Sequence, residues 1–189
     1  MTTGTVSLPA RIDVDKRTYL RTFRVTDAAA LAQAVAESLD HLRPWMPWAN
    51  ETSTSVEFQR ERLRALPGRR AQGREWQYGL YGRERDRDGT RVLGSFGFVP
   101  RMGPGTLEIG YWVHVDAVGQ GHGTRAARAL TEVALAADGV ERVFICCDEA
   151  NTRSAGIPRA LGYTLTEVIE RPPEAPGESG RLLVWAISP

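Results

Sequence analysis

The chain has 189 residues, a length that suits one domain with a sizeable hydrophobic core. Hydrophobic residues make up 42% of it and charged residues 25%, close to the globular average, which argues against a disordered or fibrous protein. Lysine and arginine total 24 against 23 acidic residues, and a formal net charge of +1 gives no long-range field that would gather nucleic acid or an anionic membrane, so neither is expected as a partner.

Basic residues are densest in one segment of the chain. Its members are Arg60, Arg62, Arg64, Arg69 and Arg70. Because charge runs of this kind usually form the solvated face of a helix, we interpret the segment as surface rather than as a nucleic-acid site.

The cysteines and the first residues bear on the cellular compartment. Cys146 and Cys147 are adjacent, and neighbours on a strand point to opposite faces, so a mutual disulfide would be strained. With no local base, they are interpreted as inert apolar residues in a reducing compartment rather than as nucleophiles. The start MTTGTVSLPA lacks the parts of a secretory signal, and no apolar run approaches the roughly 20 residues that span a bilayer. We therefore expect a cytoplasmic protein.

The first part of the chain predicts a strand, a helix and an aromatic loop. Residues 18–25 are typical of a strand, and apolar residues at helical spacing predict a helix over 27–42 that Pro44 stops. The segment LRPWMPWAN then places Trp45 and Trp48 among prolines. These prolines stiffen the loop, so the two rings are held in defined positions.

The middle of the chain predicts one helix and a three-stranded meander. Thr54 and Glu57 have the spacing of a capping box, which predicts a helix that ends before Pro67-Gly68. Turn signals at Asp88-Gly89 and MGPG then separate three strands, predicted at 75–83, 91–99 and 106–115.

The last part alternates strands with helices. The segment GQGHG opens a helix predicted over 121–138, and a shorter helix begins at Asn151 and ends at Leu161-Gly162. Three strands complete the chain, predicted at 142–148, 163–170 and 181–187.

This order of elements predicts an α+β fold. We expect a mixed, mostly antiparallel central sheet of about six or seven strands with about four helices, antiparallel in its first half and with a βαβ crossover in its second. No internal repeat or long linker divides the sequence. We therefore expect a single domain over 1–189, with its core at about 18–187.

Three glycines at alternate positions precede the long helix of the second half. Gly119, Gly121 and Gly123 lack Cβ atoms, so the backbone can approach a ligand closely. The unpaired N–H groups of a helix N-terminus carry partial positive charge, which suits a pyrophosphate. No Lys-Ser/Thr pair follows at P-loop spacing, so a nucleoside triphosphate site is not expected.

A dinucleotide-binding site is the alternative interpretation of this loop. Gly121-x-Gly123-x-x-Ala126 fits the pattern G-x-G-x-x-A, and Asp148 ends the next strand, where a ribose-binding acid would stand. However, too few residues follow the loop for the rest of a doubly wound sheet, and the strand before it ends an antiparallel meander. Both observations disfavour the alternative.

Longer segments resemble a known family. EIGYWVHVDAVGQGHGTRAARAL and ERVFICCDEANTRSAGIPRALGY resemble the acetyl-CoA-binding half of the GNAT N-acetyltransferases. The segment LRPWMPWA and its distance from the glycine loop match the RimJ/RimL-type branch, the ribosomal-protein N-terminal acetyltransferases. The resemblance covers about residues 18–187 and is specific, because separated segments match in order.

The resemblance implies a GNAT fold in which splayed parallel strands hold acetyl-CoA as co-substrate; no metal is expected. The family's pyrophosphate pattern, Gln/Arg-x-x-Gly-x-Gly/Ala, falls on residues 118–123, where Val118 departs from it by lacking a polar side chain. Backbone N–H groups make most of the contacts in such loops, so binding should survive. The residues implied to bind the cofactor are Val113, Val115, Gly119, Gly121, His122, Gly123, Thr124 and Asn151.

The family mechanism is direct attack of an amine on the thioester, without an acyl-enzyme. Backbone amides at Val113 and Val115 would hold the thioester oxygen as it gains charge. Glu108 is the candidate base, directly or through water, with no obvious cation nearby in sequence; a surface carboxylate paired with an arginine is the alternative. Tyr111 and His114 are weaker candidates, and His114 is more readily interpreted as a structural histidine.

Ser154 is the candidate acid that protonates the coenzyme A thiolate. Asn151-x-x-Ser154 resembles the family's N-x-x-S, in which the asparagine reaches the pantetheine and the serine the sulfur. Both residues also suit helix capping, and the two roles are compatible. Trp45 and Trp48 are interpreted either as a wall of the acceptor site or as anchors of their loop.

Three classes of function follow. An acyl-CoA-dependent N-acetyltransferase leads, and the alternatives are a nucleotide-cofactor oxidoreductase and a non-catalytic acyl-CoA-binding sensor of the same fold. The presence of Glu108, Asn151 and Ser154 favours catalysis over the sensor.

The acceptor and the acyl group stay open at this stage. The acceptor is either a small amine, such as an antibiotic, a polyamine or an amino-acid derivative, or a protein N-terminal amine. Glu51, Glu57 and Glu108 could attract a cationic acceptor, and succinyl-CoA as donor would need a cation near the acyl pocket. Residues 172–180 could shape the acceptor side as a flap or form a homodimer contact.

Overall fold

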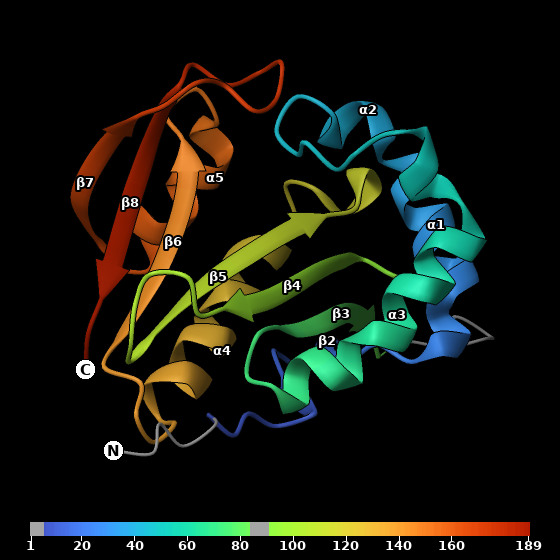
Figure 1. Cartoon of the computed structure of the whole chain (residues 1–189), viewed down its shortest axis with the longest axis horizontal. Coiled ribbons are helices and arrows are strands. Elements are labelled where there is room, and N and C mark those ends of the chain that lie inside the picture. The colour runs from blue at the N-terminus through green and yellow to red at the C-terminus, as the bar shows by residue number, and fades with distance from the viewer. Residues whose placement is uncertain (1–5, 84–90) are drawn as a thin grey trace.

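An eight-stranded mixed sheet organises the part of the chain that the structure, a computed structural model, describes: residues 6–83 and 91–189 (Figure 1). The strand order is β1-β2-β3-β4-β5-β6-β8-β7. The strands are β1 (Arg11–Asp13), β2 (Thr18–Thr22), β3 (Trp76–Gly82), β4 (Gly94–Val99), β5 (Thr106–Val113), β6 (Arg142–Asp148), β7 (Thr164–Glu170) and β8 (Arg181–Ile187). The predicted α+β sheet is confirmed, with the short β1 as an additional strand; the predicted turn Asp88-Gly89 lies outside the described residues.

Helices pack on both faces of the sheet. The described α-helices are α1 (Ala28–Glu37), α2 (Leu39–Leu42), α3 (Val56–Ala71), α4 (His122–Leu135) and α5 (Thr152–Ala160), with short 3-10 helices at η1 (Val25–Asp27), η2 (Glu51–Thr54) and η3 (Val115–Ala117). One core joins α4 to the sheet through Leu130 and Ile109, and a second joins α1 and α3 to it through Val35, Leu63 and Trp112. Because successive strand residues point to opposite faces, neighbouring residues of β5 serve different cores.

On the α1–α3 face, no helix of the described residues covers the second half of the sheet. There a third cluster of apolar residues, among them Phe144, Val184 and Ala186, packs with partly buried neighbours such as Met102. Figure 1 shows α1 and α3 beside β2 to β5, while β6, β8 and β7 form a separate wing. This arrangement leaves a space between α3 on one side and the β6–β8–β7 wing on the other.

The parallel strands β5 and β6 touch only where they begin. Their paired residues run from Thr106↔Arg142 to Glu108↔Phe144, after which the strands diverge, as Figure 1 shows. Beyond that point β5 remains paired with β4, and β6 with β8. The inner edges of both strands are therefore left to face each other across an opening, and the predicted splay is confirmed.

The first predicted helix is interrupted at Ser38. The structure has α1 and α2 where a continuous helix over 27–42 was expected. Ser38 is fully buried, and its hydroxyl accepts a hydrogen bond of 3.1 Å from the N–H of Val115, just after β5. The interruption thus lets Ser38 connect the α1–α2 junction to the end of β5.

The second predicted helix differs at both ends. Ser55, rather than Thr54, is the N-cap of α3, with its hydroxyl accepting from the N–H of Phe58 at 3.4 Å. The helix also continues through Pro67, so the predicted end there is wrong. Proline removes one helical hydrogen bond, but the burial of Leu63 and Leu66 in the second core favours continuation.

Among the described residues, no helix combines the length and apolar character that crossing a membrane requires.

Candidate active site

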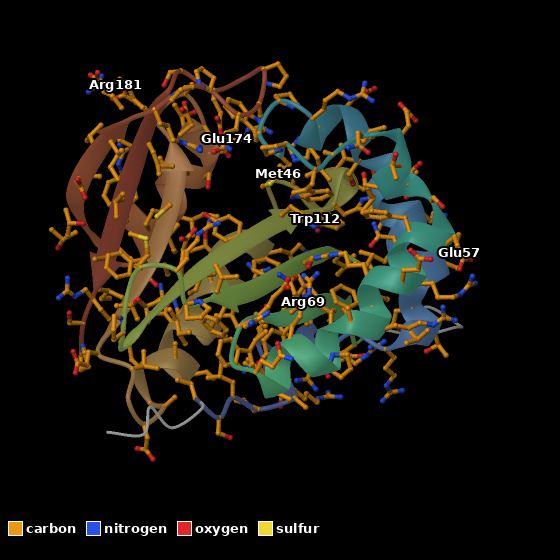
Figure 2. All side chains as sticks on the ribbon, in the orientation of Figure 1. Met46, Glu57, Arg69, Trp112, Glu174 and Arg181 are labelled. Carbon is orange, nitrogen blue, oxygen red and sulfur yellow. The ribbon has the colours of Figure 1, made fainter. Side chains whose placement is uncertain are left out.

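A cavity of about 630 Å³ occupies the space between α3 and the β6–β8–β7 wing. Its floor comes from β3, β4 and β5, and its rim from the loops after α2 and after β7. Figure 2 shows Met46 on one rim loop, Glu174 on the other, and Trp112 of β5 below them. Predicted site residues that line the cavity are Trp45, Trp48, Glu108, Tyr111, Asn151 and Ser154. The remaining predicted residues lie in or beside the glycine loop.

Glu108 is a buried carboxylate in the cavity wall. Its side chain is 3% exposed, and its Oε2 accepts from Arg101 Nε at 2.6 Å while Oε1 accepts from Arg101 Nη2. The alternative interpretation of Glu108, a carboxylate paired with an arginine, therefore describes its contacts, although the side chain is buried rather than at the surface. Arg101 was overlooked because the hairpin that pairs Val99 with Glu108 folds it back over the carboxylate.

Tyr111 and Ser154 meet across the opening between β5 and β6. Their hydroxyl oxygens are 3.0 Å apart, and either can donate. Asn151 caps α5 by accepting from the N–H of Ser154 at 3.1 Å, so the predicted cap is present. Burial raises the pKa of Tyr111 well above its usual value, and the phenol holds its proton at neutral pH.

Glu108 and Tyr111 lie on opposite faces of β5. They are three residues apart, and alternate strand residues share a face. Tyr111 packs against the core that contains α4, whereas Glu108 points to the cavity side with Trp112. The opening thus has a carboxylate on one face and a pair of hydroxyls on the other.

The glycine loop presents a row of free backbone N–H groups. Within the described chain, no group accepts a hydrogen bond from the N–H groups of residues 119–124. Gly119 and Gly121 adopt positive φ angles of 79° and 76°, which turn these amides outward without a side-chain penalty. Gly123 has a different role, because a Cβ there would lie 2.9 Å from Ile157 of α5. The arrangement suits an anion.

His122 and Thr124 begin α4. Burial, and secondarily Arg125, lowers the pKa of His122 below its usual value, so the imidazole is neutral at pH 7. Arg125 is itself held by Asp15, whose Oδ2 accepts from Nε at 2.7 Å. This ion pair connects the β1–β2 turn to the first turn of α4.

Val113 and Val115 differ in what their amides can do. The N–H of His114 donates to Leu93 on the β4 side, so the preceding N–H, that of Val113, points to the opening. By the same alternation the N–H of Tyr111 also points there, a donor that sequence reasoning did not identify. The N–H of Val115 is engaged by Ser38.

His114 is a structural histidine, as its sequence context favoured. It is 1% exposed, and its Nδ1 accepts from the N–H of Asp116 at 3.1 Å. The ring proton therefore lies on Nε2, which is 2.9 Å from a carboxylate oxygen of Glu37. These contacts hold the end of β5 against α1.

The cysteines and tryptophans occupy different parts of the cavity wall. Cys146 and Cys147 are free, and burial raises the pKa of the first thiol to about 12 and of the second to about 11. Both stay protonated at neutral pH, in agreement with the predicted inert role. Trp48 is 40% exposed and its ring centroid lies 6.3 Å from that of Trp112, while Trp45 is half-buried.

The loop between β7 and β8 closes the cavity against the tryptophan loop. The N–H of Gly177 donates to the carbonyl of Pro44 at 2.8 Å, and a Cβ at Gly177 would meet that oxygen at 2.7 Å. Within the loop, Arg171 donates to Glu178 at 3.0 Å. The loop after β7 and the loop after α2 therefore meet at the rim of the cavity, on the side shown at the top of Figure 1.

Asp148 fastens the same loop at its far end. Its carboxylate accepts from the N–H groups of Ala150 and Ser179 at 2.9 Å each and from that of Gly180 at 3.1 Å. Burial alone would raise the pKa of Asp148, but these hydrogen bonds, led by that of Ser179, hold it below 3.8. The oxygens are thus occupied by the chain's own amides, which disfavours the ribose-binding role of the dinucleotide alternative.

Comparison with known proteins identifies the family of this chain. The family model described as an acetyltransferase (GNAT) domain matches residues 17–164. The chain belongs to the GNAT family of N-acetyltransferases. No curated protein sequence matches the chain.

Solved structures of other GNAT enzymes share its fold. Ribosomal-protein-S5-alanine acetyltransferase from Vibrio fischeri is 17% identical, with a TM-score of 0.82 over 95% of this chain and 97% of that one. RimJ of Mycobacterium smegmatis, in complex with CoA-disulfide, is 23% identical, with a TM-score of 0.79 over 98% and 86%. The microcin C7 self-immunity acetyltransferase MccE, in complex with acetyl-CoA and AMP, is 18% identical, with a TM-score of 0.83 over 96% and 97%.

The hydrogen bonds of Asp148 predict a pH-dependent contribution to stability. A carboxyl whose pKa falls on folding stabilises the protein above its unfolded value and loses this effect as the pH falls through the folded value. Asp148→Asn should lower the free energy of unfolding by about 1–3 kcal/mol at pH 7. The difference from the unsubstituted enzyme should shrink only below pH 3.8. Urea unfolding between pH 3 and 7 measures it.

Glu149→Gln is the matched control, because the Glu149–Arg181 ion pair is about half exposed. It should change the free energy of unfolding by less than about 1 kcal/mol. An effect of Asp148→Asn no larger than that of the control would contradict the fastening role of Asp148.

Proposed function

We propose that this N-acetyltransferase moves the acetyl group of acetyl-CoA to a primary amine by direct attack within the opening between β5 and β6. The observation that carries the proposal is the two-sided opening, with Glu108 on one face and the Tyr111–Ser154 pair on the other. An amine that enters from the cavity meets the carboxylate, while the departing sulfur meets the hydroxyls. Attack and departure thus have separate proton routes.

Backbone groups of the opening fit the coenzyme. The free amides of residues 119–124 suit the diphosphate. The unpaired inner edges of β5 and β6 carry N–H and C=O groups that need partners, and a pantetheine arm has amides to supply them. The N–H groups of Tyr111 and Val113 would hold the thioester oxygen as negative charge develops on it. The Val118 departure removes a side-chain contact and leaves all of these in place.

Glu108 is assigned the proton of the attacking amine, directly or through one water. A carboxylate has about four acceptor sites, and Arg101 occupies one on each oxygen, so sites remain for an ammonium or a water. Arg101 also fixes the orientation of the carboxylate. Holding the amine and the thioester together in the opening can contribute about 7–11 kcal/mol of barrier reduction.

Ser154 is assigned the proton that the leaving thiolate takes up. When the C–S bond breaks, Ser154 Oγ donates its proton to sulfur and can receive one from the Tyr111 hydroxyl. Burial raises the pKa of Tyr111, so the phenol carries its proton at neutral pH. We therefore assign Tyr111 not as a base, for which it was a weak candidate, but as the proton donor to Ser154.

The acceptor is a protein N-terminal amine or a small amine, and acetyl is favoured as the transferred group. The names of structural neighbours include acetyltransferases of ribosomal proteins and of microcin C7, which supports both acceptor classes. A succinyl group would need a free cation beside the opening, and Arg101 and Arg171, which line that part of the cavity, are both paired with carboxylates. A homodimer stays a proposal that sedimentation can decide.

An acceptor screen tests the proposed function. Purified enzyme and acetyl-CoA should release free thiol in the presence of primary amines, and mass spectrometry should find the matching acetylated amine. Short peptides with free N-termini and small amines form the two arms. Peptides with blocked N-termini serve as controls. Thiol release without any acetylated amine, or none with any amine, would contradict the proposal.

Ser154→Ala should lower kcat by about 10²-fold or more, because the thiolate then leaves without its proton donor. Acetyl-CoA affinity should stay within a few-fold, since the variant keeps the Asn151 cap acceptor and the loop amides. Steady-state kinetics and calorimetry measure the two quantities. Thr152→Ala, an exposed change at the start of α5, is the control and should leave kcat unchanged. Unchanged kcat in Ser154→Ala would remove Ser154 from the mechanism.

A further inference from the structure

Arg62 is a charged residue of the cavity wall that has no partner in the described part of the chain. It lies on α3 one turn from Gln59 and from Leu66, two residues of the buried helix face, so its side chain is directed to the cavity. Among the described residues, none accepts a hydrogen bond from Arg62 or forms an ion pair with it, whereas the other arginines of the wall, Arg101 and Arg171, are each paired.

The electrostatic state of Arg62 makes this lack of a partner costly. Burial lowers the pKa of its guanidinium, which the nearby charge of Glu75 partly offsets. Glu75 accepts from Arg69 at 2.8 Å, and within the described chain it forms no hydrogen bond or ion pair with Arg62. Arginine nevertheless stays protonated at neutral pH. A partly desolvated cation without a counter-charge is unfavourable unless a ligand supplies one.

A second donor lies on the floor beside this wall. The hydroxyl of Ser95 on β4 donates to Oε1 of Gln77 on β3 at 3.0 Å, which turns the Gln77 amide so that its NH₂ group is left without an acceptor among the described residues. Guanidinium and amide N–H groups share one requirement, a hydrogen-bond acceptor. Together they are suited to a carboxylate or another oxyanion.

We propose that Arg62, with Gln77, binds an anionic group carried by the acceptor amine. The inference rests on the proposed function and names the acceptor more closely: a primary amine with a carboxylate at some distance from its nitrogen. The nitrogen lies at Glu108 and the anion at Arg62, so opposite ends of the acceptor meet opposite charges.

Strand spacing sets the separation of the two ends. Gln77 is on β3, two strands from β5, which corresponds to roughly 10 Å at about 4.8 Å per strand. A long amino acid or a peptide with an acidic side chain near its N-terminus can span this distance. The carboxylate of a succinyl donor, confined to the opening at β5, would fall short of it.

Matched acceptors and variants test the inference. The small acceptors are γ-aminobutyrate and 6-aminohexanoate, each compared with its amide, and the peptides are Ala-Glu-Ala-Gly-amide and Ala-Gln-Ala-Gly-amide. The enzyme should prefer each charged acceptor over its neutral partner in kcat/KM by about tenfold or more, as charge-assisted hydrogen bonds predict. The preference should be larger for the longer amino acid, and the stronger of the two arms identifies the source of the anion.

Arg62→Gln should abolish this preference through KM, while Arg62→Lys should retain part of it. Arg64→Gln is the matched control, an exposed arginine on the same helix, and should keep the full preference. Coenzyme A calorimetry on each variant verifies that it is folded. The effect of Arg62→Gln on kcat/KM should be the same with succinyl-CoA as donor as with acetyl-CoA.

Two results would overturn the inference. Thiol release that is equal for charged and neutral acceptors, or a preference that survives in Arg62→Gln, contradicts the role of Arg62 and leaves the proposed function standing. Absence of thiol release with every primary amine, in protein that binds coenzyme A, contradicts the proposed function and the inference with it.

Discussion

The structure depends on how little of β5 and β6 is paired. The two strands are paired only over their first residues, up to Glu108 and Phe144. Beyond that point β5 is paired with β4 alone and β6 with β8 alone. Because the outer ladders satisfy half of the backbone groups, the strands can separate without losing the sheet. The inner edges become a polar slot that opens on both faces. The glycine loop stands where β5 ends and α4 begins, so its amides lie at one end of this slot.

Because the opening between β5 and β6 has two faces, it can present different chemical groups on each. Because side chains alternate along β5, Glu108 points to the cavity side and Tyr111 to the face of α4 and α5. There the Tyr111 hydroxyl contacts Ser154 on the first turn of α5. The rim is held closed by contacts distant from the reacting groups: Gly177 to Pro44, and Asp148 to the strand that returns from the loop. Within the described chain, the arginines of the wall near the opening, Arg101 and Arg171, are paired with carboxylates and Arg62 is not. On the proposed assignment, the cavity thus has a catalytic end at Glu108 and a recognition end at Arg62.

Local patterns allowed part of this to be predicted from sequence. The glycine loop, the asparagine cap of α5, and the element order that implies a crossover depend on residues close in the chain. Three features were not predicted, because each is decided by a contact between separate elements: Arg101 as the particular partner of Glu108, the interruption at Ser38 and the continuation through Pro67. Arg62 had been counted as one member of a solvated basic run. Its exposed neighbour Arg64 fits that description, and only the packing of α3 tells them apart.

Calorimetric titration of coenzyme A into Gly121→Val and Gly139→Val tests the central claim most directly. Both glycines have φ near 80° and flank α4, so the backbone strain of a side chain should cost each variant about 1–2 kcal/mol of stability. A Cβ at Gly121 would also lie 2.6 Å from the flexible end of Arg125, whereas none of the described residues comes within 4 Å of one at Gly139. Only Gly121 lies among the free amides. The account predicts that Gly121→Val loses coenzyme A affinity by about tenfold or more while Gly139→Val retains it. Equal affinities in the two variants would contradict the assignment of the loop.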